Sequence, residues 1–363
     1  MAAKEKIAEP TYLECGFGEL EYKVIKSDIC CLCGTCEALC PRIEHVQDKP
    51  DLVMYDPHCG LCYTYCPRSF LDMSKMESKL FGRTRRSEEK LGVYKKALSA
   101  QAAYREALAQ DGGVATALLV YALESGMIDC AIITDKDDEW RTVSRVATTA
   151  DEIRSAAGTK YTINNSVNAL AEALNMGFEK IGFVGTPCQI QGLRKVQLLE
   201  EPYEFGQDKI ALLVGLFCME NFDYNLLMNG LVKGRFGLDP KDVVRFEIKK
   251  GMFRVIDKQG KVNEVKLEET DQYNFKGCGP CFDFASELAD ISVGSVGSAD
   301  GWSTVLLRTE KGEKLYADAL AAGALKEKAV SEKGLALAGR LAENKENRFK
   351  TRSAEMNVSG INR

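Results

Sequence analysis

Two patterns of apolar and polar positions recur along the chain and predict helices and strands. Residues 114–124 carry apolar side chains at helical spacing, begin after a Gly-Gly pair and end before Gly126, which predicts a helix. Residues 128–134 form a short, mostly apolar run that is typical of a buried strand. The same signatures predict helices over 167–175, 189–199, 310–322 and 333–347, and strands over 180–184 and 210–217.

A third pattern, with period two, covers residues 243–256 and 262–267 and predicts a more antiparallel section. The alternation of strands and helices from about residue 95 predicts an α/β core, α+β overall, with antiparallel additions. Residues 79–96 are rich in Lys, Arg, Ser and Glu, which favours a linker. We therefore expect a small domain over 1–78, a linker over 79–96, a larger domain over 97–350 and a loose tail over 351–363.

Composition narrows the classes of protein that fit. The chain has 363 residues, 45% hydrophobic and 28% charged, which indicates two or three globular domains rather than disorder. The formal charge of −5 shows no basic excess, so we expect no nucleic-acid partner. No apolar run approaches the ~20 residues of a membrane span, and the first residues lack the apolar stretch of a signal peptide. We expect a cytoplasmic protein, with any membrane attachment made through a partner complex.

Cysteine and histidine usage points to metal chemistry. The sequence contains 14 cysteines, and in a reducing compartment such cysteines more often bind metal than form disulfides. It contains only two histidines, His45 and His58. No histidine follows Cys66, which excludes a Ser-His hydrolase or an HExxH zinc site in the larger part of the chain.

The first cysteine run has the spacing of a bacterial ferredoxin motif. Two residues separate successive members of the first three cysteines, three residues precede the fourth, and a proline follows. These residues are Cys30, Cys33, Cys36, Cys40 and Pro41. A second, incomplete copy supplies Cys59, Cys62, Cys66 and Pro67. The repeat predicts a ferredoxin-like domain with two [4Fe-4S] clusters, whereas a zinc ribbon would show two CxxC pairs instead.

Cross-ligation in this motif gives the two clusters unequal ligand sets, because the fourth cysteine of each run binds the other cluster. One cluster is complete, with Cys30, Cys33, Cys36 and Cys66. The other has Cys40, Cys59 and Cys62 but no fourth cysteine, because Asp56 stands where the first copy has Cys30. The fourth ligand could be Asp56, the neighbouring His58, or a spare thiol from Cys31 or Cys15. In the fourth case the position stays open and the site holds a three-iron cluster.

The five remaining cysteines lie further along the chain. Cys130 falls inside an apolar strand and is expected to be a core thiol. Cys188 begins a helix after a strand, Cys218 ends a strand, and Cys278 and Cys281 form a CxxC rich in turn-forming residues. Strand ends meet at the edge where α/β sheets bind ligands, so these four thiolates are candidates for one metal site. A redox-active pair at Cys278 and Cys281 and a zinc site are the alternatives.

Several stretches of the larger domain resemble the flavin-containing beta subunits of coenzyme F420 hydrogenase and dehydrogenase. They are residues 110–117, 157–162, 186–189, 215–221 and 289–297. The resemblance extends from about residue 100 to the C-terminal helix. Together with the double ferredoxin module, it is greatest for the electron-input subunit type of archaeal F420H2 dehydrogenase. It implies that Cys188, Cys218, Cys278 and Cys281 hold a third [4Fe-4S] cluster and that the domain binds FAD, with coenzyme F420 as substrate.

The residues themselves give weaker support for the flavin site. Asp111, Gly112 and Gly113 open a helix and offer free backbone N–H groups to a pyrophosphate, although a simple helix cap looks the same. Lys160 is a candidate for phosphate binding and Tyr161 for stacking on a ring. Further candidates in the matching stretches are Thr116, Thr186, Pro187, Gly294 and Gly297. The lack of GxGxxG argues against a standard dinucleotide-binding fold.

These features together predict an oxidoreductase that takes a hydride from F420H2 onto FAD and passes single electrons through [4Fe-4S] clusters to a partner. The partner would be another redox subunit of a larger membrane dehydrogenase, hydrogenase or reductase complex. No catalytic acid or base is predicted, because the cofactors carry the chemistry. The alternatives are a polyferredoxin-like electron-transfer adaptor without flavin, and a flavin enzyme of the same family with another substrate.

Overall fold

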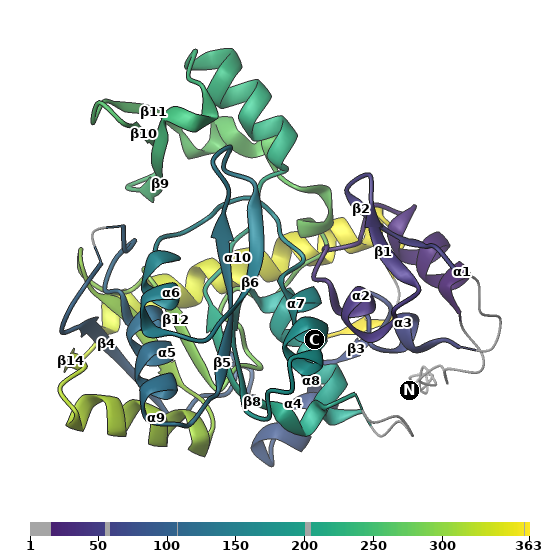
Figure 1. Ribbon diagram of the computed structural model, residues 1–363, viewed down its shortest axis with the longest axis horizontal. Helices are drawn as coiled ribbons and strands as arrows, with labels where there is room; N and C mark the ends of the chain where they lie inside the picture. The colour runs from purple at the N-terminus through teal and green to yellow at the C-terminus, as the bar shows by residue number, and fades with distance from the viewer. Residues whose placement is uncertain (1–15, 55–58, 107, 200–204, 359) are drawn as a thin grey trace.

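The computed structural model describes residues 16–54, 59–106, 108–199, 205–358 and 360–363, and its centre is a mixed eight-stranded sheet (Figure 1). The strand order is β14-β4-β13-β12-β8-β7-β5-β6. The strands are β4 (Lys96–Ala102), β5 (Cys130–Lys136), β6 (Thr142–Ala147), β7 (Ile181–Gly185), β8 (Ile210–Leu216), β12 (Ile291–Gly294), β13 (Ser303–Leu307) and β14 (Leu325–Lys328). Four neighbours, β12, β8, β7 and β5, are parallel, and the pairs at either side are antiparallel. The expected α/β core with antiparallel additions is confirmed.

Helices cover both faces of this sheet because consecutive strand residues point to opposite sides. Ala131 and Ile133 pack in one apolar cluster with α5 (Val114–Glu124) and α9 (Glu310–Ala321). Cys130 and Ile132 pack in another cluster on the opposite face. That second cluster includes residues of α4 (Met73–Phe81), α7 (Ala169–Asn175) and α8 (Pro187–Leu198). The core-thiol prediction for Cys130 is therefore confirmed.

Beyond the main sheet, three strands form the expected antiparallel section. They are β9 (Val243–Lys249), β10 (Met252–Asp257) and β11 (Val262–Lys266), in the order β11-β10-β9. In Figure 1 they lie at the top of the molecule, away from the main sheet. Their buried residues share one apolar cluster with the π-helix η4 (Leu226–Arg235). The period-two prediction for this region is confirmed.

The cysteine-rich part of the chain packs directly against the large domain. Its described elements are α1 (Phe17–Leu20), η1 (Glu21–Ile25), α2 (Thr35–Leu39), β1 (Ile43–Val46), β2 (Lys49–Leu52), α3 (Leu61–Thr64) and β3 (Leu71–Asp72). The Val167 N–H donates to the Cys33 carbonyl at 3.1 Å. A Cβ on Gly34 would lie 2.4 Å from the Asn165 carbonyl oxygen, and one on Gly192 would lie 2.1 Å from Thr35 Oγ1. Two glycines therefore permit the close approach of the two parts.

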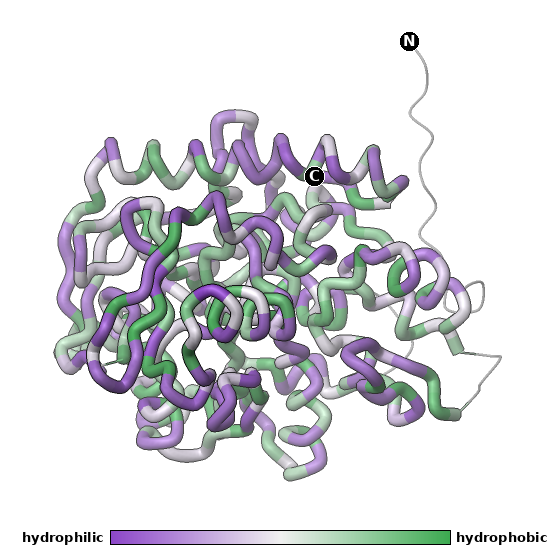
Figure 2. The backbone as a smooth tube through the Cα atoms, turned by 90° about the horizontal axis from the view of Figure 1, so that it is seen from above, coloured by the Kyte–Doolittle hydropathy of each residue, from purple (hydrophilic) through white to green (hydrophobic). Residues whose placement is uncertain are grey.

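The expectation of a loose tail over 351–363 was wrong. Helix α10 runs from Glu332 to Glu355, beyond the predicted 333–347, and buries Phe349. It lies across the back of Figure 1 and along one edge of Figure 2, where hydrophilic and hydrophobic residues alternate along it. After it, β15 (Ile361–Asn362) pairs in parallel with β3. The Arg363 side chain is largely buried and forms ion pairs with Glu287, at 2.5 Å, and with Glu346, so these long-range contacts order the segment.

None of the helices in the described ranges is both long and apolar enough to cross a bilayer.

Candidate metal and cofactor sites

Four cysteines of the first ferredoxin-like group line one hollow in the structure. Cys30 and Cys33 come from the loop before α2, Cys36 from α2 itself, and Cys66 from the turn after α3. The hollow measures about 350 Å³, part of it open to solvent. These are the four residues that sequence spacing assigns to the complete cluster. Four soft thiolate donors around one hollow fit the ligand set of a [4Fe-4S] cluster.

The electrostatics of these thiols are consistent with metal ligands. Burial, followed by the charge of Cys66, raises the pKa of Cys30 to about 12. Burial and the charge of Cys30 raise the pKa of Cys36 well above its usual value. Buried thiols that resist ionisation alone are deprotonated when they coordinate a metal, because the metal supplies the missing positive charge.

The second group, Cys40, Cys59 and Cys62, lies beside the first. Burial, and then the charges of Cys40 and Cys59, raise the pKa of Cys62 to about 12. Cys31 does not lie with this group: it is buried against Cys33 and Cys188 instead. The hypothesis that Cys31 supplies the missing ligand is therefore not supported by its position. The other candidates for that ligand, Asp56, His58 and Cys15, lie outside the described residues.

The third group gathers Cys188, Cys218, Cys278 and Cys281 at the carboxyl end of the parallel strands. Thr186 caps α8, and its hydroxyl lies 3.3 Å from the Sγ of Cys188 in the first turn. Cys218 follows β8, and Cys278 ends the short helix η7 (Lys276–Cys278). Burial, and then the charges of Cys188 and Cys281 among others, raise the pKa of Cys278 to about 12. Segments far apart in the sequence are thus brought together as the strand-end argument expects.

Cys281 differs from the other thiols of this group. Its burial alone would raise the pKa, but Lys345 and Arg68 lower it below the usual value. Lys345 is buried on α10, and its Nζ donates to the carbonyls of Cys218, at 2.6 Å, and Asp283, at 2.8 Å. Two buried cations therefore lie beside this group.

Within the described ranges, no three cysteine, histidine or acidic side chains converge as a site for a single metal ion. A four-iron cluster binds each of its thiolates through a different iron, so its ligands surround a larger volume than one ion occupies.

The candidate flavin residues lie mainly in loops at the same edge of the sheet. Asp111, Gly112 and Gly113 follow β4 and lead into α5. One expectation for them was wrong: the Gly112 N–H is not free, because it donates to Ser303 Oγ at 3.1 Å. Asp111 is half-buried, and burial raises its pKa although Lys249 lies nearby.

Lys160 and Tyr161 are adjacent in the sequence but face different groups. The Lys160 Nζ donates to the Ala156 carbonyl, and burial lowers its pKa to about 8. Tyr161 meets the Phe253 ring edge-on, with 6.0 Å between the centroids. Burial raises the Tyr161 pKa, and Asp111 contributes to the shift. Tyr161 therefore lies near Asp111, whereas the Lys160 Nζ is bound to a carbonyl of its own segment.

The remaining flavin candidates have identifiable packing roles. Thr186 and Pro187 begin α8, and Thr116 lies half-buried on α5. A Cβ on Gly294 would lie 2.1 Å from the Phe217 ring, and Gly297 has a φ of +104°. Sequence reasoning missed Arg68 and Lys345, the buried cations beside the third cysteine group. The position of Arg68 two residues after Cys66 was a usable signal, whereas nothing local distinguishes Lys345 from a surface lysine.

Comparison with known proteins identifies the family. A model described as the N-terminal part of the coenzyme F420 hydrogenase/dehydrogenase beta subunit matches residues 97–171, and the model of its C terminus matches residues 178–333. The chain belongs to this family. It is 42% identical over 277 residues to the coenzyme F420 hydrogenase subunit beta of Methanothermobacter thermautotrophicus, covering 75% of this chain and 98% of that relative.

Two further relatives and one solved structure extend the comparison. An F420H2 dehydrogenase subunit of Methanosarcina mazei is 32% identical over 312 residues, covering 81% of this chain and 83% of that relative. The coenzyme F420-dependent sulfite reductase of Methanocaldococcus jannaschii is 39% identical over 310 residues, which span 46% of its length. A chain of the F420-reducing [NiFe] hydrogenase complex from Methanosarcina barkeri superposes with a TM-score of 0.70 at 39% identity, covering 75% of this chain and 95% of that chain.

Proposed function

We propose that this protein is an F420-linked oxidoreductase subunit that oxidises F420H2 and passes single electrons to a partner in a larger redox complex. Family membership supports the link to F420, since relatives are named as an F420 hydrogenase, an F420H2 dehydrogenase and an F420-dependent sulfite reductase. The likeness to a chain of a hydrogenase complex supports the multi-subunit setting.

The observation that carries the proposal is the row formed by the three cysteine groups. Cys188, in the group at the sheet edge, is buried against Cys31 and Cys33. Cys33 belongs to the complete ferredoxin-like group. Cys66 of the same group lies close enough to Cys62 of the second group for its charge to raise the pKa of Cys62. The groups therefore run from the sheet edge through residues 30–66 in the order third, first, second. Such an order suits a one-electron relay that starts where the sheet binds its ligand.

The cysteines and the edge loops have distinct roles in this proposal. Residues 1–78 form the domain that carries two [4Fe-4S] clusters, and residues 97–350 form the domain that carries the third cluster and FAD. A bound flavin can exchange a hydride with F420 and single electrons with iron–sulfur clusters. Asp111 and Tyr161 orient the flavin at the carboxyl edge of the strands. The Lys249–Asp300 ion pair, at 3.0 Å, links the outer sheet to the loop after β12 on the solvent-exposed surface.

Anaerobic purification of the full chain tests this function. We expect about 12 irons per chain, one extractable FAD, and oxidation of F420H2 with a one-electron dye as acceptor. Iron without flavin and without F420H2 oxidation would favour the electron-transfer adaptor. Flavin that F420H2 does not reduce would favour another substrate for the same fold.

A further inference from the structure

Arg68 is a buried arginine at the junction of two cysteine groups. The residue is only 2% exposed to solvent. Its backbone N–H donates to the Sγ of Cys66 at 3.4 Å, which ties it to the complete ferredoxin-like group. Its guanidinium charge lowers the pKa of the Cys281 thiol, which belongs to the third group. One residue is therefore hydrogen-bonded to a ligand position of the first group and electrostatically linked to a ligand position of the third group.

The guanidinium lacks the partners that a buried arginine normally has. Its Nε and Nη1 atoms are buried and have no hydrogen-bond acceptor among the described residues. An arginine left buried without a counter-charge is strongly destabilising, so the fold requires an anionic partner at this place. The groups that most favour its charge are the cysteines Cys31, Cys281 and Cys188. Thiolate-ligated clusters on either side would supply the negative charge.

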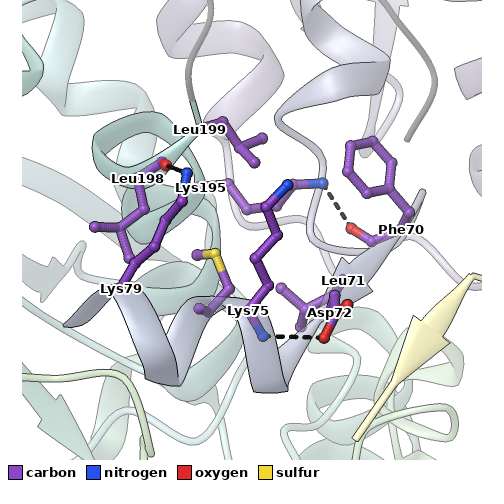
Figure 3. A pocket seen from close by; sticks show the side chains of 9 residues that line it. Phe70, Leu71, Asp72, Lys75, Lys79, Lys195, Leu198 and Leu199 are labelled. Carbon is purple, nitrogen blue, oxygen red and sulfur yellow. Dashed lines mark hydrogen bonds between the residues drawn. The ribbon is translucent and has the colours of Figure 1, made fainter. Parts of the chain in front are cut away.

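Two buried lysines show what is particular about Arg68. Lys345 donates to the carbonyls of Cys218 and Asp283 and so lies beside the third group. Lys195 donates to the carbonyls of Cys66, at 2.7 Å, and Phe70, at 2.6 Å, beside the first group; Figure 3 shows its side chain directed at Phe70. The first and third groups thus each have a lysine of their own, whereas Arg68 is shared between these two groups.

We infer that Arg68 is a positioning residue for electron transfer, a shared cation that raises the reduction potentials of both neighbouring clusters. The inference rests on the proposed function, because it concerns clusters that the cysteine groups would hold. A nearby positive charge stabilises the reduced cluster, which carries one more negative charge than the oxidised one. Net charge and hydrogen bonds to sulfur are among the factors that set cluster potentials.

A redox titration of the holoprotein followed by EPR tests this role. The variant Arg68→Met removes the positive charge and should lower the reduction potentials of both clusters. For the third cluster, the ratio of oxidised to reduced protein at a fixed potential should rise at least tenfold, which is about 59 mV for one electron. Arg68→Lys keeps the positive charge, so the reduction potentials of both clusters should stay close to those of the wild-type protein. The matched controls are Lys345→Met, which should shift the third cluster alone, and Lys195→Met, which should shift the first alone.

The outcomes separate this inference from the proposed function. Unchanged potentials in Arg68→Met with full iron content overturn the inference. If Arg68→Met and Arg68→Gln both lose iron while Arg68→Lys keeps it, the residue serves cluster assembly, and its role in raising the reduction potentials is likewise overturned. Wild-type protein without the signals of the first and third clusters would instead overturn the proposed function.

Discussion

At the scale of single residues, local spacing and long-range burial define different parts of the site. The cysteines of the first group are close in sequence or repeat a known spacing, so their grouping follows from the chain alone. Arg68 and Lys345 become special only because folding removes them from water beside thiols. Charge and burial of this kind depend on contacts between distant segments, which no local pattern encodes.

Cys188 provides the first test at this scale. In Cys188→Ser the third group loses a thiolate from the first turn of α8, so the protein should contain about four fewer irons per chain. Reduction of bound flavin by F420H2 should persist, while transfer to the partner should slow at least tenfold. The control is Cys130→Ser, which alters another buried thiol, outside the three groups, and should keep its iron. Equal iron content in the two variants would contradict a ligand role for Cys188.

The second cluster should be the most labile, because its fourth ligand is not one of the cysteines grouped by the structure. If the carboxylate of Asp56 fills that position, it is a harder ligand than a thiolate and holds its iron less firmly. Mild oxidation should then release one iron and produce a three-iron EPR signal. The variant Asp56→Cys should suppress that signal, and His58→Ala should leave it unchanged. The reverse pattern would assign the ligand to His58.

At the scale of elements, the sequence predicts the parts with strong periodicity and misses those stabilised by partners. Helix α5, strand β8 and the antiparallel section were found because their patterns are long and bounded by turn residues. The short strands β12 and β13 were not, since a run of four or five residues resembles a buried loop until it pairs. The C-terminal segment was misjudged for the same reason: β15 exists because β3 is there to pair with it.

The C-terminal ion pairs should contribute measurably to stability. The Arg363 side chain is only 8% exposed and pairs with Glu287, which is fully buried, so Arg363→Met leaves that carboxylate with Arg85 as its remaining ion-pair partner among the described residues. Breaking a buried pair on one side typically costs about 3 kcal/mol. Thermal unfolding should therefore begin at a clearly lower temperature. Arg352→Met removes an exposed pair with Glu355 and should change stability by less than about 0.5 kcal/mol. Equal melting curves for the two variants would refute the structural role of the segment.

At the scale of the whole molecule, the docking of residues 16–54 and 59–81 on the large domain determines how close the cysteine groups lie. Helix α2 approaches α8 so closely that Gly192 has no room for a side chain beside Thr35. The same approach brings Cys31 and Cys33 to Cys188. The third group therefore meets the first only if this interface closes completely.

Enlarging Gly192 should separate the groups without touching a ligand. In Gly192→Val the new side chain would collide with Thr35, and overpacking of this kind costs about 1–3 kcal/mol and shifts the backbone. Iron content and flavin reduction by F420H2 should remain, because all cysteines are retained. Electron arrival at the ferredoxin-like clusters, followed by freeze-quench EPR after mixing with F420H2, should slow several-fold. The matched control is Gly339→Ala on α10, where a Cβ makes only an ordinary contact, 3.8 Å from the Lys90 side chain. An unchanged transfer rate in a folded, iron-replete Gly192→Val protein would show that this interface does not lie on the electron path.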